Sequence, residues 1–210
     1  LHRLLENDES VGAADLSLTM GVERVHFPHR AAIVARSREE MSQRLTLLAK
    51  GEGDEGISEG TPLDDAHSGP VFVFSGQGAQ WHAMGRGLLA TSRVFRGVIE
   101  RCDRFIGQWG EWSLLKELGK SKTRSRINET AIAQPAIFAV QAGLAELWKS
   151  WGMTPAATVG HGGGEVAGAY VSGALTLGEG CRVIHWRGAC MDATTERGEM
   201  LAAALTEEEA

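Results

Sequence analysis

The sequence predicts an α/β fold with a mostly parallel sheet, preceded by a smaller α/β unit. Two short apolar runs, residues 71–74 and 156–159, have the composition of buried strands. Segments with helical periodicity separate and follow these runs, and strands that alternate with helices form parallel sheets. Residues 51–70 are rich in glycine and acidic side chains, as linkers are, and therefore divide the chain into residues 1–50 and 71–210.

The composition is that of a globular protein. Of the 210 residues, 43% are hydrophobic and 23% are charged. No apolar run approaches the ~18 residues that a membrane span needs, and the formal net charge of −6 argues against nucleic acid as the main partner. Cys102, Cys181 and Cys190 lack the spacing of metal ligands, so we expect no metal site and three reduced, buried thiols in a cytoplasmic protein.

The first unit is expected to be a small α/β unit. Ala13–Met20 is a short helix candidate that Gly21 could end. Ala31–Ala35 has the apolar composition of a buried strand. Ser37 and Glu40 then form a capping box at the start of a second helix. With so few residues, this unit is expected to dock on another surface.

The second unit begins with the strand Val71–Phe74 and the glycine-containing loop Ser75–Gln80. Glycines on both sides of Gln77 permit close approach of the backbone to a ligand, although a plain strand-to-helix turn explains them as well. In a parallel sheet, active sites lie at the carboxyl ends of the strands, where this loop falls.

Two long helices are predicted next. Apolar residues with helical spacing from Val94 to Ile106 indicate a strongly amphipathic helix. Pro135 is placed in the first turn of the second helix, which Gly152 ends. Near the other end of the chain, a further apolar segment begins at Met200.

A glycine-rich corner follows the second strand. Gly160, Gly162 and Gly164 keep the spacing of the G-x-S-x-G nucleophile elbow, in which a serine stands above a parallel sheet. Here the central residue is Gly162, which has no side chain and cannot act as a nucleophile. A phosphate-binding corner is disfavoured because Glu165 occupies the position of a third small residue, whereas a purely structural corner stays open.

The second helix predicted after the corner carries a single charged residue on its predicted apolar face. Thr176 and Glu179 form its capping box. The face itself comprises Val183, Ile184, Arg187, Cys190 and Met191. Arg187 either reaches water or pairs with an internal acid such as Glu165, or it binds the carboxylate of a substrate.

Two histidines lie near these segments. His161 precedes Gly162 and either lines the site or is a packed, hydrogen-bonded residue. His185 falls off the predicted apolar face and is expected at the surface. Neither residue has a spacing that identifies a catalytic base.

Taken together and in this order, four motifs resemble the acyltransferase domain of type I polyketide synthases. They are Phe74–Trp81, the helix start Gln134–Ala136, the corner Gly160–Glu165 and the helix that carries Arg187. The resemblance implies an α/β-hydrolase-like large subdomain. It places the catalytic histidine and much of a ferredoxin-like small subdomain beyond Ala210.

Two finer features of the resemblance concern the kind of synthase and the first unit. Residues 81–86 and 125–129 look similar to highly reducing iterative synthases. Residues 1–50, which include the segment His26–Arg30, resemble the linker domain between ketosynthase and acyltransferase.

The resemblance also implies a mechanism, in which an elbow serine accepts a malonyl or methylmalonyl group from CoA. The group then passes to the phosphopantetheine thiol of an acyl carrier protein. Gln77 and Gly163 would supply the N–H groups that hold the oxyanion. Arg187 would bind the free carboxylate of the malonyl or methylmalonyl group, which is the extender unit. Supporting or lining positions are Glu165, Gly160, Gly164, His161 and Gln134. Expected partners are the carrier protein, the CoA thioester and a neighbouring ketosynthase; no cofactor is expected to bind directly.

One position departs from the family, because Gly162 stands where the nucleophilic serine is expected. Loss of the nucleophile typically costs on the order of 10⁴- to 10⁶-fold in rate. The chain is therefore predicted to be inactive or severely impaired. The alternative is a non-catalytic scaffold or docking module within a multidomain synthase.

Overall fold

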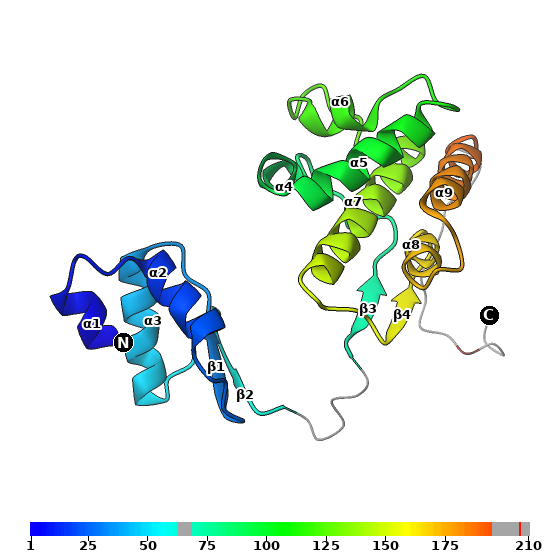
Figure 1. The fold of residues 1–210 in the computed structure, drawn as a ribbon. Coiled ribbons are helices and arrows are strands. Elements are labelled where there is room, and N and C mark those ends of the chain that lie inside the picture. The colour runs from blue at the N-terminus through cyan, green and yellow to red at the C-terminus, as the bar shows by residue number, and fades with distance from the viewer. Residues whose placement is uncertain (63–68, 195–205, 207–210) are drawn as a thin grey trace. The chain divides into compact units, whose positions relative to one another are not determined.

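A computed structural model describes most of the chain as two units, each with its own internal packing (Figure 1). The units are residues 1–67 and 68–210. The described residues are 1–62, 69–194 and 206. The apolar segment predicted from Met200 lies outside them.

The first unit combines short helices with one antiparallel pair of strands. Its described elements are α1 (His2–Asn7), α2 (Ala13–Leu18), the π-helical turn η1 (Thr19–Glu23), β1 (Arg30–Ile33), α3 (Arg38–Lys50) and β2 (Ile57–Gly60). Arg30 pairs with Gly60, and Ile33 pairs with Ile57. The predicted linker at residues 51–70 is therefore wrong in part, because the chain turns back after α3 and completes the sheet of the first unit.

Two local predictions for the first unit are wrong. Gly21 does not end the helix, because η1 continues the helical turns through it and the backbone becomes extended at Arg24. Strand β1 is not buried, since a two-stranded sheet offers few side chains to cover it. The cap of α3 forms in a modified way: Ser37 Oγ accepts from the N–H of Glu40, whose carboxylate accepts from the N–H of Arg36.

The second unit contains a parallel pair of strands, as predicted. Its described elements are β3 (Val71–Phe74), α4 (Arg86–Thr91), α5 (Arg93–Ile106), α6 (Leu114–Gly119), α7 (Thr130–Ser150), β4 (Ala157–Gly160), α8 (Gly164–Val171) and α9 (Leu177–Asp192). Val71 lies opposite Ala157, and Phe74 lies opposite Gly160. The pairing brings the carboxyl ends of both strands to the same edge.

The sheet is buried on one face, not on both. Phe74 is 6% exposed and packs in the core, whereas Val73 is 74% exposed and Val159 is 55% exposed. The alternation follows from the strand period of two, which turns successive side chains to opposite faces. The helices cover one face of the two strands, so the apolar run of β3 is only half buried.

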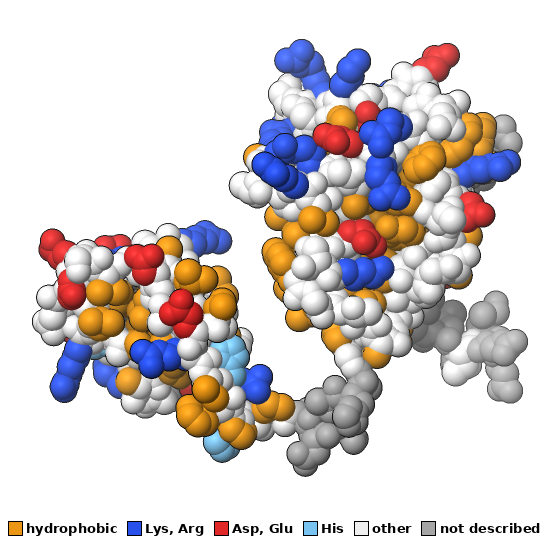
Figure 2. Space-filling view, in the orientation of Figure 1, with side chains coloured by type: hydrophobic (Ala, Val, Ile, Leu, Met, Phe, Trp, Pro, Cys, Tyr) orange, Lys and Arg blue, Asp and Glu red, His pale blue; other side chains and the backbone are white. Residues whose placement is uncertain are grey.

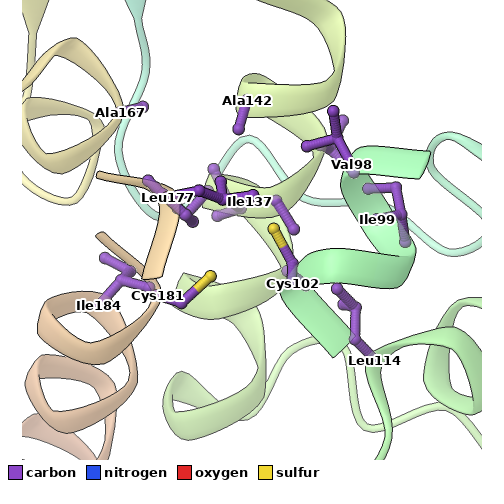
Figure 3. Packing of buried hydrophobic residues seen from close by; sticks show 14 of the residues in the cluster. Val98, Ile99, Cys102, Leu114, Ile137, Ala142, Ala167, Leu177, Cys181 and Ile184 are labelled. Carbon is purple, nitrogen blue, oxygen red and sulfur yellow. The ribbon is translucent and has the colours of Figure 1, made fainter. Parts of the chain in front are cut away.

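The core of the second unit is built around α7, which packs against α5, α8 and α9. Figure 3 shows Val98 and Cys102 of α5 beside Ile137 of α7 and Cys181 of α9. Glycines let these helices approach closely. A Cβ on Gly143 would lie 2.7 Å from the Phe95 ring, which is fully buried.

The start of α7 differs from the prediction. The helix begins at Thr130, so Pro135 lies in its second turn rather than its first. Proline there removes one helical hydrogen bond, which an N-terminal position would have spared. Burial of Ile132 and Ala133 in the core stabilises the extra turn and outweighs that loss.

Helix α9 has the predicted capping box, in which Thr176 Oγ1 accepts from the N–H of Glu179. Its buried face, however, is not the predicted one. The buried residues are Leu177, Gly180, Cys181, Ile184, His185 and Gly188. Two glycines belong to this face because they leave room for neighbouring side chains and backbone, and a count of apolar residues misses them. As a result, Cys190 is exposed rather than buried.

His185 is 7% exposed, contrary to the prediction of a surface residue. Its ring lies 6.0 Å from that of Trp109 and 5.0 Å from that of Trp186. Burial lowers the pKa of His185, so the neutral imidazole is favoured there.

Glu117 of α6 anchors the segment that leads into α7. Its side chain is buried and accepts from Lys120 Nζ at 2.7 Å, Ser125 Oγ at 3.0 Å and the N–H of Arg126 at 2.6 Å. Burial acts to raise the pKa of Glu117, but these three hydrogen bonds outweigh it and lower the pKa below its usual range.

Candidate active site

The glycine corner forms a tight turn between β4 and α8. His161 donates its backbone N–H to the carbonyl of Phe74 at 3.0 Å, and Gly164 donates to the carbonyl of His161 at 3.0 Å. Gly162, at the tip, has φ +55°, in the left-handed region where a residue with a side chain is strained, and nucleophile elbows are strained turns of this kind. The corner therefore has the geometry that the G-x-S-x-G spacing predicts.

The glycines around the tip are required by space. A Cβ on Gly164 would overlap the carbonyl of Phe74 and would lie 2.8 Å from that of Ser75. A Cβ on Gly160 would overlap the backbone of Glu165, and one on Gly76 would lie 2.7 Å from the carbonyl of His161. Contacts this short are not seen for real Cβ atoms, so the corner and the loop after β3 can meet only where side chains are absent.

The tip itself is open. Among the described atoms within 4 Å, a Cβ on Gly162 would meet Nη2 of Arg187 alone, at 3.9 Å. A Cβ on the next residue, Gly163, would lie 3.9 Å from Nη1 of Arg187 and 4.0 Å from Oε1 of Gln134. The fold thus brings a guanidinium and an amide to the place where an elbow side chain would stand.

Arg187 is half-buried and donates from Nη1 to Oε1 of Gln134 at 2.6 Å. Across the described ranges, no carboxylate forms an ion pair with it. The pair with Glu165 that the sequence left open is not formed. Glu165 instead lies exposed in the first turn of α8, where a negative charge is favourable.

The predicted residue Gln77 joins the same group. Its Oε1 accepts from Nε2 of Gln134 at 3.1 Å, and its Nε2 donates to Oγ1 of Thr130 at 3.1 Å. Farther along α7, Gln141 donates to the carbonyl of Ser75 at 2.7 Å. Thr130 and Gln141 are not among the site residues predicted from the sequence, although polar residues at helical spacing in an otherwise apolar helix are a usable signal.

His161 is exposed, and its Nδ1 would lie 3.2 Å from a Cβ on Gly76. It therefore lies at the contact between the corner and the loop after β3. Neither His161 nor Glu165 contacts Arg187 in the way that Gln134 does. Arg187 and Gln134 thus lie beside the tip of the corner, and the hydrogen bond from Gln134 to Gln77 connects them to the loop after β3.

Two kinds of feature are absent from the described residues. None of the described helices combines the length and the apolarity needed to cross a membrane. Over the same residues, no three His, Cys, Asp or Glu side chains are grouped as a metal would require.

Two known protein families match this chain. Residues 71–210 match the family described as acyl transferase domain, and residues 1–45 match the family described as CurL-like, PKS C-terminal. Erythronolide synthase EryA2 of Saccharopolyspora erythraea is 38% identical over 205 residues, which are 97% of this chain and 6% of that protein. Squalestatin tetraketide synthase of Phoma sp. is 37% identical over 215 residues, 100% of this chain and 8% of that protein.

Solved structures show the same relationship. The acyltransferase domain from module 8 of the salinomycin polyketide synthase is 32% identical, with a TM-score of 0.81 over 91% of this chain and 45% of that one. The malonyl-CoA:ACP transacylase of Synechocystis sp. PCC 6803 is 25% identical, with a TM-score of 0.53 over 60% of this chain and 41% of that one. The chain thus corresponds to less than half of these structures and to a small part of the curated relatives. It belongs to the acyl transferase domain family and is homologous to the acyltransferase domains of type I polyketide synthases.

Proposed function

We propose that this chain is the extender-binding region of a polyketide synthase acyltransferase. The observation that carries the proposal is the position of Arg187, whose Nη2 lies 3.9 Å from the Cβ position of Gly162. A half-buried guanidinium that no described carboxylate neutralises favours an anionic ligand. The free carboxylate of a malonyl or methylmalonyl group, bound through the two guanidinium nitrogens, supplies that anion.

The backbone offers donors for the thioester oxygen of the same ligand. In residues 69–194, the N–H groups of Gln77 and Gly163 form no backbone or side-chain hydrogen bond. Both residues adjoin the corner, and unused N–H groups are the donors that oxyanion sites employ. Gly160, Gly164 and Glu165 support the turn by their close backbone packing, and His161 and Gln134 line it.

Gly162 makes the chain unable to form an acyl-serine at the elbow. Without that nucleophile, the thioester can bind but cannot transfer its acyl group through this residue. The second candidate function, a non-catalytic scaffold or docking module in a multidomain synthase, is favoured by Gly162 and by no other position. Arg187 favours the binding function, because a scaffold has no need for a guanidinium beside the elbow tip.

The same proposal implies the acyl donor and the acyl acceptor. The donor is malonyl-CoA or methylmalonyl-CoA, and the acceptor is the phosphopantetheine thiol of an acyl carrier protein. The similarity to a malonyl-CoA:ACP transacylase supports both choices. Residues 1–50 serve as the linker between ketosynthase and acyltransferase, in a synthase of the highly reducing kind.

Isothermal titration with malonyl-CoA and acetyl-CoA tests the binding proposal, because the two ligands differ by one carboxylate. Malonyl-CoA is expected to bind at least roughly tenfold more tightly, and Arg187→Leu is expected to remove the difference. Equal affinities in the native chain would contradict the role of Arg187.

Intact-mass measurement tests the second part of the proposal. After incubation with malonyl-CoA, the native chain is expected to gain no mass. A stable adduct at a defined residue would show that the chain is acylated in spite of Gly162.

A further inference from the structure

Gln134 lines the corner, and the further role inferred for it here rests on the function proposed above. Gln134 is 2% exposed and uses both ends of its amide. Its Oε1 accepts from Nη1 of Arg187 at 2.6 Å, and its Nε2 donates to Oε1 of Gln77 at 3.1 Å. The same nitrogen also donates to Sδ of Met191 at 3.1 Å. The buried amide therefore connects the guanidinium directly to the loop after β3.

Arg187 sets the direction of this series of hydrogen bonds. A guanidinium only donates, so Gln134 must present its oxygen to Arg187 and its nitrogen to Gln77. Gln77 must then present its own oxygen to Gln134, which leaves its nitrogen for Oγ1 of Thr130 at 3.1 Å. Turning the Gln134 amide over would place donors against donors at Arg187. A single arrangement of the two amides is therefore favoured.

Helix α7 holds the series on one face. Thr130 and Gln134 are one turn apart, and Gln141 lies two turns farther along on the same side. Gln141 fixes the start of the loop through the carbonyl of Ser75 at 2.7 Å. Because Gln134 is buried, water does not compete for its hydrogen bonds, and the low local dielectric strengthens them.

We propose that Gln134 is a positioning residue that couples Arg187 to Gln77 in the loop after β3. A carboxylate bound to Arg187 orients the guanidinium, and Gln134 transmits that constraint to Gln77. The backbone N–H of Gln77 is the donor proposed above for the thioester oxygen. Recognition of the carboxylate and placement of the thioester are thereby linked, so an acyl group without a carboxylate meets a less ordered loop.

The first test replaces Gln134 by methionine. Methionine keeps the length and apolar burial of the side chain, but it neither accepts from Arg187 nor donates to Gln77. In titrations with malonyl-CoA and acetyl-CoA, Gln134→Met is expected to lower the preference for malonyl-CoA roughly threefold or more. The affinity for acetyl-CoA is expected to change less than the affinity for malonyl-CoA.

A double-mutant cycle measures the coupling itself. Arg187→Leu and Gln77→Met are combined, and the affinity for malonyl-CoA is measured for each variant. With Gln134 in place, the two effects are expected to be non-additive by roughly threefold. In the Gln134→Met background, they are expected to be additive. Persistent coupling in that background would show that Gln134 does not carry it.

Two matched controls separate positioning from general loosening. Gln108→Met makes the same change at an exposed position beyond the end of α5 and is expected to leave the preference unchanged. Gln141→Met releases the start of the loop without a contact to Arg187, so it is expected to weaken both ligands by a similar factor. Circular dichroism melts show whether each variant is folded.

If Gln134→Met does not fold, Gln134→Glu provides the second measurement. Its carboxylate pairs with Arg187 and competes with the ligand, so the preference for malonyl-CoA is expected to disappear. Native-like preference in a folded Gln134→Met or Gln134→Glu chain would overturn the inference while leaving the role of Arg187 intact. If Arg187→Leu itself leaves the preference unchanged, the proposed function fails and this inference fails with it.

Discussion

The two units of this chain are stabilised in different ways. In the second unit, buried side chains from β3 and α5 to α9 form one continuous core. In the described part of the first unit, the buried hydrophobic residues are Leu5 and Leu16. The guanidinium of Arg38 stabilises this unit instead, because it donates hydrogen bonds to three backbone carbonyls. These are the carbonyls of Leu5, Asp8 and Val11. A unit too small to bury a large core depends more on charge-assisted hydrogen bonds.

The two units also differ in net charge and in packing. Residues 1–67 hold 7 Lys and Arg against 13 Asp and Glu, whereas residues 68–210 hold 14 of each. The first unit thus carries the whole net charge of −6. Figure 2 shows Lys and Arg side chains gathered over α4, α5 and α6 of the second unit. An apolar hollow of about 500 Å³ also remains in the first unit, between α2, β1 and α3.

The substitution expected to destabilise the chain most lies in the core of the second unit. Phe95 is fully buried, so Phe95→Ala is expected to cost about 3–5 kcal/mol of unfolding free energy. All 6 tryptophans lie in residues 68–210, so tryptophan fluorescence during urea unfolding reports this unit alone. The matched change Leu16→Ala is expected to leave the fluorescence transition unmoved. A shift of that transition by Leu16→Ala would show that the units are not independent in stability.

A slightly smaller effect is expected at the glycine corner. Gly164→Ala forces a Cβ against the backbone of β3 and is expected to cost about 3 kcal/mol. Gly162→Ser meets open space and carries only the strain of φ +55°, of order 1 kcal/mol. Thermal melts of the two variants provide the comparison. A clear rise in melting temperature for Gly162→Ser would contradict the strained-elbow interpretation.

The third prediction concerns the stability of the first unit and the role of Arg38. Arg38→Leu leaves three backbone carbonyls without their donor and is expected to lower the melting midpoint of this unit by roughly 5–10 °C. Far-ultraviolet circular dichroism should detect the change while the fluorescence transition stays in place. Arg36→Leu, at an exposed side chain two residues earlier, is the control. Equal effects of both variants would argue against the special role of Arg38.

The fourth prediction concerns pH. The folded pKa of Glu117 is lowered, so its stabilising effect is complete above the unfolded pKa of about 4.3 and is lost as pH falls through the folded value. Glu117→Gln is expected to cost about 2 kcal/mol at pH 7 and progressively less below pH 4. Stability curves of both proteins between pH 7 and pH 3 should therefore converge. Parallel curves would contradict this account.

The smallest effect is a difference in reactivity without a change in stability. A hydrogen bond with Cys181, together with burial, raises the pKa of the Cys102 thiol. Cys190 is exposed. Iodoacetamide is expected to modify Cys190 in the native chain, and Cys102 and Cys181 only after unfolding. Peptide mapping of the labelled chain identifies the modified thiols, and rapid labelling of Cys102 would indicate that the core opens readily.

Local structures that depend only on neighbouring residues can be predicted from the sequence of this chain. The apolar run of β3, the cap at Thr176 and the spacing of Gly160, Gly162 and Gly164 predicted local structures that are present. Each is specified within a few residues by backbone conformation or by a short-range hydrogen bond. The motifs at these places also indicated the family, which the comparisons confirm.

Contacts between side chains that are distant in the sequence depend on how the helices and loops pack. Pro135 lies inside a helix because the core holds the preceding turn, and His185 is buried because glycines turn that face of α9 inward. The bond between Gln134 and Arg187 joins residues 53 apart, and the bond between Gln77 and Gln134 joins residues 57 apart. No local pattern specifies such contacts, since they arise from the packing of α7 against α9 and against the loop after β3. The residues proposed to bind and position the acyl group were visible in the sequence, but their connection required the fold.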